Sequence, residues 1–84
     1  MLYHFQVRTE THVVLTEAAE LPTVEEARLE AGRRTGELLR VHAEQLWRDE
    51  EWRMDVTDHD GLILFVIQIS AMRTAATQAD TAPT

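Results

Sequence analysis

The chain has 84 residues, a formal net charge of −7 and no cysteine. This length fits one small domain, and the absence of cysteine excludes a disulfide framework, a thiolate nucleophile and a cysteine-based zinc site. The acidic balance disfavours nucleic-acid binding, because Lys and Arg side chains supply most of that affinity. No run approaches the ~20 apolar residues of a membrane helix, and the N-terminus lacks a signal-peptide pattern. We therefore expect a cytoplasmic protein that does not bind membranes.

Two short strands are predicted near the N-terminus. Apolar and polar side chains alternate over residues 3–8, which indicates a half-buried strand. The β-branched residues at 12–16 predict the return strand of a hairpin. With residues 9–11 as the connection, Val7 would face Val13, and the apolar faces of the two strands would agree.

A long helix is predicted next. Thr23 and Glu26 have the spacing of a capping box, and apolar residues then recur with a helical period to about Arg48. Gly32 and Gly36 lie inside this helix, where each costs about 1 kcal/mol relative to Ala. We therefore expect another backbone to pack close to them, either the sheet or a second copy of the helix.

A second hairpin over residues 52–69 organises the rest of the chain. Its first half alternates apolar with polar side chains, and its second half is almost wholly apolar. Asp60 and Gly61 between the two halves favour a two-residue type I′ turn. This turn predicts three apolar cross-strand pairs, which are Val56 with Phe65, Met54 with Ile67, and Trp52 with Ile69.

The last predicted strand is apolar on both faces. Its inner face would carry Ile63, Phe65, Ile67 and Ile69, and its outer face Leu62, Leu64 and Val66. A continuous apolar run of this kind is typical of a central strand, so we expect the strand order 2-1-4-3. One helix cannot cover both faces of a sheet, and the apolar outer face therefore indicates a partner.

These elements predict an α+β fold with the order β-β-α-β-β. A four-stranded, antiparallel-rich sheet would carry one long helix packed on one face. The domain is expected to span residues 1–73. Residues 74–84 are small and polar, a composition that does not bury enough apolar surface to order itself, so we predict a flexible C-terminal tail there.

Three motifs carry a family resemblance. They are the aromatic start Y-H-F-Q-V, the beginning of the helix E-L-P-T-V-E-E-A-R, and the hairpin W-R-M-D-V-T-D-H-D-G-L-I-L-F-V-I. Over residues 3–71 the chain resembles the short bacterial proteins grouped as domain-of-unknown-function family 6894, which implies a fold and a bacterial source but no chemistry. The beginning of the helix is also similar to that of HicB-type antitoxin domains, and such fold-level analogy does not license a function.

Candidate ligand-binding residues are few. His4, Arg8 and His12 fall on the outer sheet face in the predicted hairpin, where two imidazoles are possible metal ligands, although solvated histidines are the simpler interpretation. His42 lies in the apolar stripe of the helix and is expected at the edge of the core or in an interface. His59 is expected to be a turn residue.

The acidic residues of the second hairpin form no recognisable site. Residues 58–61 resemble part of a calcium loop, but Val56 and Ile67 stand where further oxygen ligands are required. Asp58 is better explained as the acceptor of a backbone amide in the turn. The remaining interpretation is a solvated charged face, formed by Glu50, Glu51, Asp55 and Asp58. No catalytic, cofactor-binding or metal-binding constellation is recognisable.

The favoured hypothesis is a non-enzymatic interaction module that forms a homodimer, because apolar and aromatic surface residues are typical of interface centres. The predicted interface comprises Leu62, Leu64, Val66, Leu29, Gly32, Gly36 and Trp47. One alternative is an antitoxin-like or regulatory domain that binds a separate protein. Another is a small-ligand or metal-binding protein that uses His4, Arg8 and His12.

Overall fold

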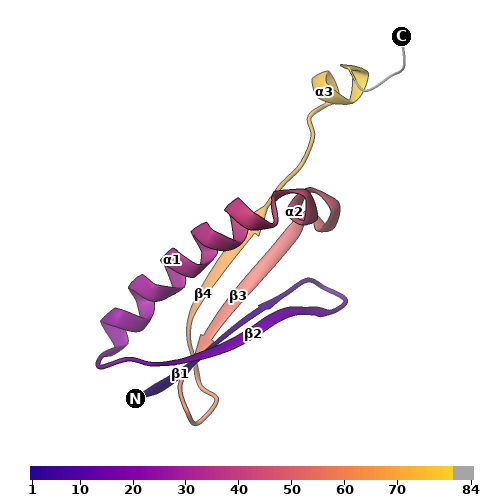
Figure 1. Cartoon of the computed structure of the whole chain (residues 1–84). Coiled ribbons are helices and arrows are strands. Elements are labelled where there is room, and N and C mark those ends of the chain that lie inside the picture. The colour runs from indigo at the N-terminus through magenta and orange to yellow at the C-terminus, as the bar shows by residue number, and fades with distance from the viewer. Residues whose placement is uncertain (81–84) are drawn as a thin grey trace.

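The structure is a computed structural model that describes residues 1–80. Its elements (Figure 1) are β1 (Leu2–Arg8), β2 (Val13–Glu20), α1 (Val24–Val41), α2 (Ala43–Asp49), β3 (Glu51–Thr57), β4 (Ile63–Ser70) and α3 (Ala75–Asp80). The strands form one four-stranded antiparallel sheet, and α1 packs across one face of it. The predicted α+β class is confirmed. The predicted tail, residues 74–84, includes α3. Residues 81–84 of the tail lie outside the described part of the chain.

The strand order is β2-β1-β3-β4, so the predicted order 2-1-4-3 is wrong. β3 lies beside β1, with Gln6 opposite Asp55 and Val7 opposite Met54. The alternating β3 suits the central position because β1 matches it on both faces, apolar against apolar and polar against polar. The almost wholly apolar β4 is left at an edge of the sheet.

The core lies between the sheet and α1. Its largest contributors come from β1 and β3 and are at most 2% exposed; they are Tyr3, Phe5, Val7, Trp52, Met54 and Val56. Ala27 and Ala31 of α1 are also buried, and their small side chains let the helix approach the sheet closely. Thr35 is buried one turn later, and its hydroxyl donates to the Ala31 carbonyl oxygen at 2.8 Å, so the polar atom is satisfied.

α1 begins at the predicted cap. The Thr23 hydroxyl accepts a hydrogen bond from the Glu26 backbone amide at 3.1 Å. The helix ends after 18 residues, short of the predicted end near Arg48. His42 interrupts it with φ −116° and ψ 37° and precedes α2. Because of this break Leu46 of α2 packs against the core, while His42 is exposed and does not lie at the core edge as expected.

The β3–β4 hairpin has the predicted pairs but a different turn. All three apolar pairs are confirmed. A type I′ turn is excluded because, of the two central residues Asp60 and Gly61, only Gly61 has a positive φ, of 86°. The Gly61 amide donates to the Asp58 carbonyl at 3.0 Å, and the Asp58 amide donates to the Leu62 carbonyl at 3.1 Å, which makes a three-residue loop. A β-bulge opposite Val56 then restores the predicted register.

This bulge changes the faces that two side chains occupy. Ile63 pairs with Thr57 and lies on the outer face, so its predicted inner position is wrong. Leu64 packs against the core, and the predicted outer stripe is therefore interrupted in its middle. Leu62 and Val66, on either side of it, are exposed.

The β1–β2 hairpin also contains a bulge. A tight turn closes it, and the bulge follows opposite Val7. Val7 therefore faces Leu15, and Arg8 faces Val13. The predicted Val7–Val13 pair is wrong, because the local pattern does not reveal an inserted residue. Val13 instead lies exposed on the outer face.

Candidate functional site

The outer face of the sheet, opposite α1, has a charged centre. Asp55 lies there with only 5% of its surface exposed. Its Oδ1 accepts a hydrogen bond from Arg53 Nε at 2.7 Å, and Arg8 Nη2 lies 3.2 Å from its Oδ2. Each carboxylate oxygen thus has a guanidinium partner, which is the condition for burying a charged group. The predicted solvated acidic face is therefore wrong for Asp55.

Arg8 and Arg53 stand directly opposite each other on β1 and β3. Like charges in such a pair repel, and the Asp55 carboxylate between them offsets the repulsion. The three groups together carry one net positive charge. The Arg8 and Arg53 side chains are 42% and 37% exposed, so their guanidinium groups reach the surface. The sequence alone places Arg53 and Asp55 on the same strand face, so their ion pair could have been predicted. The ion pair between Arg8 and Asp55 could not, because it depends on the β1–β3 pairing.

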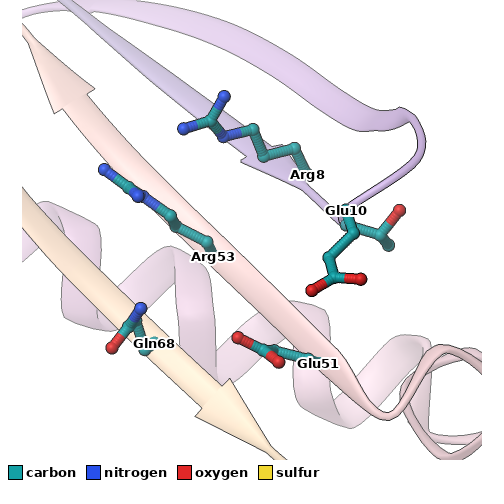
Figure 2. A pocket seen from close by; sticks show the side chains of 6 residues that line it. Arg8, Glu10, Glu51, Arg53 and Gln68 are labelled. Atoms are coloured by element: carbon teal, nitrogen blue, oxygen red, sulfur yellow. The ribbon is translucent and has the colours of Figure 1, made fainter.

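A hollow of about 230 Å³ lies beside this cluster (Figure 2). It is lined by Arg8, Thr9, Glu10, Glu51, Arg53 and Gln68. The carboxylates of Glu10 and Glu51 lie together at one end, and the two guanidinium groups point away from them. Acidic and basic groups offset each other here, so this hollow offers no single sign of charge to a ligand.

A second hollow of about 400 Å³ lies along the same face and shares Arg8 with the first. Its lining differs in charge and consists of His4, Gln6, Arg8, Thr16, Asp55, Thr57, Gly61 and Ile63. His4 and Arg8, which the sequence proposed as ligand residues, do meet here. The only acidic group in the lining is Asp55, whose two oxygens already have partners.

The third proposed ligand residue, His12, lies elsewhere. Its Nδ1 is 3.1 Å from the hydroxyl oxygens of Thr9 and Thr11 in the β1–β2 turn, while His4 sits in the middle of the sheet opposite Ala18. The structure therefore does not bring the two histidines together. Among residues 1–80, no group of three His, Asp or Glu side chains is arranged to hold a metal ion.

The acidic turn behaves as expected for a structural element. The Asp58 carboxylate accepts backbone amides from Asp60 at 2.9 Å and Leu62 at 3.0 Å, which confirms its predicted role. His59 lies in this turn, with its Nε2 3.4 Å from an Asp60 carboxylate oxygen. In the described part of the chain, no helix is both long and apolar enough to cross a bilayer.

Asp49 anchors the start of β3 to the end of α2. The buried Trp52 donates its indole N–H to Asp49 Oδ2 at 2.7 Å, and the Gln45 amide donates to both carboxylate oxygens. The hydrogen bond from Trp52 and, to a smaller extent, those from Gln45 hold the pKa of Asp49 below its usual value. Glu50, the next residue, has a left-handed backbone with φ 67°, a conformation that disfavours a residue with a side chain.

The residues predicted to form an interface lie mostly on the surface. Leu62 and Val66 are exposed near and on β4, and Leu29 and Trp47 are exposed on the helices. Apart from the adjacent residues and the nearby backbone of α1 itself, no atom of the described chain lies within 4 Å of where a Cβ of Gly32 would stand, and the same holds for Gly36. The sheet is therefore not the backbone that was expected to pack against these glycines.

The model of one protein family matches the chain over residues 2–70, and its description is Domain of unknown function (DUF6894). No curated protein and no solved structure matches the chain. The family resemblance of the sequence is thus confirmed, whereas no comparison supports the similarity to HicB-type antitoxins.

Proposed function

Because this chain belongs to the family DUF6894, whose description assigns no activity, we propose a function from its structure: a non-enzymatic interaction module that forms a homodimer by pairing β4 with β4 of a second copy. The observation that carries the proposal is the free and uncharged edge of β4. Two copies related by a two-fold axis would join their sheets into one continuous sheet.

β4 offers one side of its backbone for pairing. As the last strand in the order it is bonded, among residues 1–80, only to β3, so alternate N–H and C=O groups point away from the sheet. Natural proteins protect such edges with charged residues, proline or bulges. β4 contains no charged residue and no proline, and its bulge lies near its beginning. Residues 65–70 therefore form a regular edge that lacks the usual protection.

A second copy would also cover the apolar side chains of β4. α1 packs over β3, so Phe65, Ile67 and Ile69 are only half-buried on the helix side. In a β4–β4 pair the two β3 strands would lie three strand spacings apart, about 14 Å. Packed helices lie about 8–10 Å apart, so the two α1 helices would enclose a narrow strip above the paired strands. The three apolar side chains of each copy would fill that strip.

The flank of α1 that borders this strip contains a glycine. Arg34 lies on the β2 side of the helix, where its guanidinium is 3.3 Å from the Glu17 carboxylate. With 3.6 residues per turn, Gly32 and Leu39 fall on the opposite flank, toward β4. The free space around Gly32 would let a second helix approach there without a steric clash.

Solution mass, measured by light scattering after gel filtration, tests the proposal. Ile63 and Val66 are 47% and 44% exposed in the single chain, so a variant with Ile63→Lys and Val66→Lys should fold and run as a monomer. Val13 is 54% exposed at the opposite edge, and the matched variant Val13→Lys should remain dimeric with the wild type. A monomeric wild type at micromolar concentration, or a dimer that persists in the double variant, contradicts the proposal.

A different protein could use the same surface. An extended segment of a partner can add to a free sheet edge, and an antitoxin-like or regulatory domain would bind its partner through β4 in this way. A wild-type chain that is folded and monomeric would favour this second function over the homodimer.

A further inference from the structure

The 400 Å³ hollow on the outer face is lined mainly by hydrogen-bonding side chains. His4, Gln6 and Arg8 alternate along β1 and therefore point to the same face, and Thr57 stands opposite His4 on β3. The side chains of His4, Gln6 and Thr57 line this hollow and are each only half-buried. Three polar side chains are thus accessible to a ligand beside a guanidinium group.

Arg8 is the cationic group that this hollow offers to an anion. Asp55 is the only acidic residue of the lining, and its two oxygens are engaged by Arg53 Nε and Arg8 Nη2. Arg53 lines the neighbouring hollow and not this one, so the net positive charge belongs to the cluster of two arginines and one aspartate as a whole. The pairing with Asp55 also fixes the orientation of Arg8, so little conformational entropy is lost when Arg8 binds a ligand.

The neighbouring hollow is less suited to an anion, because the carboxylates of Glu10 and Glu51 line it and would repel negative charge. The larger hollow instead carries Ile63 in its lining, an apolar side chain that is half exposed. We propose that the larger hollow binds a small organic anion, with its carboxylate or phosphate group on Arg8 and its apolar part against Ile63. The site lies within one chain and does not depend on dimerisation.

Titrations followed by NMR of the full chain test the site, with sodium butyrate and inorganic phosphate as probes at constant low ionic strength. The backbone amides of Gln6 and Thr57 should shift in a saturable manner, with a dissociation constant of about 1 mM or lower. Saturation by butyrate alone identifies a carboxylate ligand, saturation by phosphate alone identifies a phosphate ligand, and either result supports the site. The absence of saturable shifts with both probes overturns it.

Variants separate the site from a general charge effect. Arg8→Gln should weaken binding about tenfold or more, because it removes the charge-assisted hydrogen bonds. Arg40→Gln, on the exposed surface of α1, is the matched control and should bind as the wild type does. If Arg8→Gln disturbs the fold by leaving Asp55 less well paired, Thr57→Val provides the test instead, since it keeps the Arg8–Asp55 pair and removes one donor. Unchanged affinity in a folded Arg8→Gln or Thr57→Val variant overturns the proposal.

Discussion

The two edge strands of the sheet are alike in size and place but opposite in chemistry. β2 and β4 each have eight residues, and each is the outer strand of a hairpin with one β-bulge. The bulges lie at matching positions, opposite Val7 of β1 and Val56 of β3. β2 carries Glu17 and Glu20, whereas β4 has no charged residue. The two hairpins therefore share a geometry and differ in what protects their outer edges.

The β2 edge is also covered on the helix side. The Arg34 guanidinium lies 4.7 Å from the centroid of the Phe5 ring and 3.3 Å from the Glu17 carboxylate. The N-terminal amino group contacts the Glu20 carboxylate at 2.6 Å. Phe65 of β4 is half-buried, with no comparable ion pairs along its strand in the described chain. One edge is thus flanked by charged groups of the same chain, and the other has no such groups among the described residues.

The largest expected effect comes from truncating one phenylalanine beside each edge. Phe5 is buried, so Phe5→Ala should cost about 3–5 kcal/mol of unfolding free energy at any protein concentration. Phe65→Ala should cost less in the single chain, and its cost should grow with protein concentration as a second copy contributes burial. Urea unfolding at two well-separated concentrations measures both. If the two variants lose equal amounts of unfolding free energy, and neither loss varies with protein concentration, the two edges do not differ in the way described.

Removing the Arg34 side chain beside the β2 edge should have an intermediate effect on stability. Arg34→Ala removes the contact with the Phe5 ring and the ion pairs with Glu17 and Glu30, and we expect a loss of about 1–2 kcal/mol. Arg34→Lys keeps the charge but lacks the planar guanidinium, so it should retain only part of the stability that Arg34→Ala loses. Chemical denaturation measures the free energy of unfolding of both variants. If Arg34→Ala leaves that free energy unchanged, Arg34 does not stabilise this edge.

Two glycines of α1 sharpen the comparison further. Gly36 lies on the exposed side of the helix, and Gly36→Ala should stabilise the chain by about 0.5–1 kcal/mol in any oligomeric state. Gly32 lies on the β4 side, so Gly32→Ala should stabilise the single chain equally but weaken the dimer by keeping the helices apart. Thermal unfolding together with the dimer dissociation constant separates the two effects. Identical behaviour of the two variants would place the second helix away from Gly32.

The smallest effect is a pH dependence at the start of β3. The pKa of Asp49 is lowered in the folded chain, mainly by the hydrogen bond from Trp52. Its stabilising contribution is therefore fully present above the unfolded pKa, which is about 3.9, and is lost as the pH falls through the lower folded pKa. Asp49→Asn should reduce the acid-induced loss of stability, measured by unfolding across this pH range. Glu10→Gln, at an exposed position in the β1–β2 turn, is a control for the general effect of removing one carboxylate.

Local patterns in the sequence predict much of this architecture. The alternation in β1 and β3 identifies the buried apolar residues of both strands, and the Thr23–Glu26 spacing locates the beginning of α1. The β3–β4 register was predicted correctly from the wrong turn, because a three-residue loop and a bulge opposite Val56 together shift the pairing as the predicted two-residue turn would. Patterns of this kind indicate which face of the sheet a residue occupies, but they do not reveal a β-bulge or the length of a loop.

Features that depend on tertiary packing could not be predicted in this way. The apolar run of β4 suits a central strand in one chain, yet it lies at an edge, where a second chain would make it central. The helix break at His42 carries no glycine or proline signal. The burial of Asp55 depends on Arg8, which lies far away in the sequence and becomes a neighbour only through the β1–β3 pairing.

Amide hydrogen exchange in the two edge strands is the most direct test of the central claim, that β4 is the edge at which a second copy pairs. Alternate backbone amides of β4 point away from the sheet and lack a partner in the single chain, so their protection should increase with protein concentration. The equivalent amides of β2 should exchange at a rate that does not depend on concentration. Fast and concentration-independent exchange along the outer edge of β4 would contradict the claim.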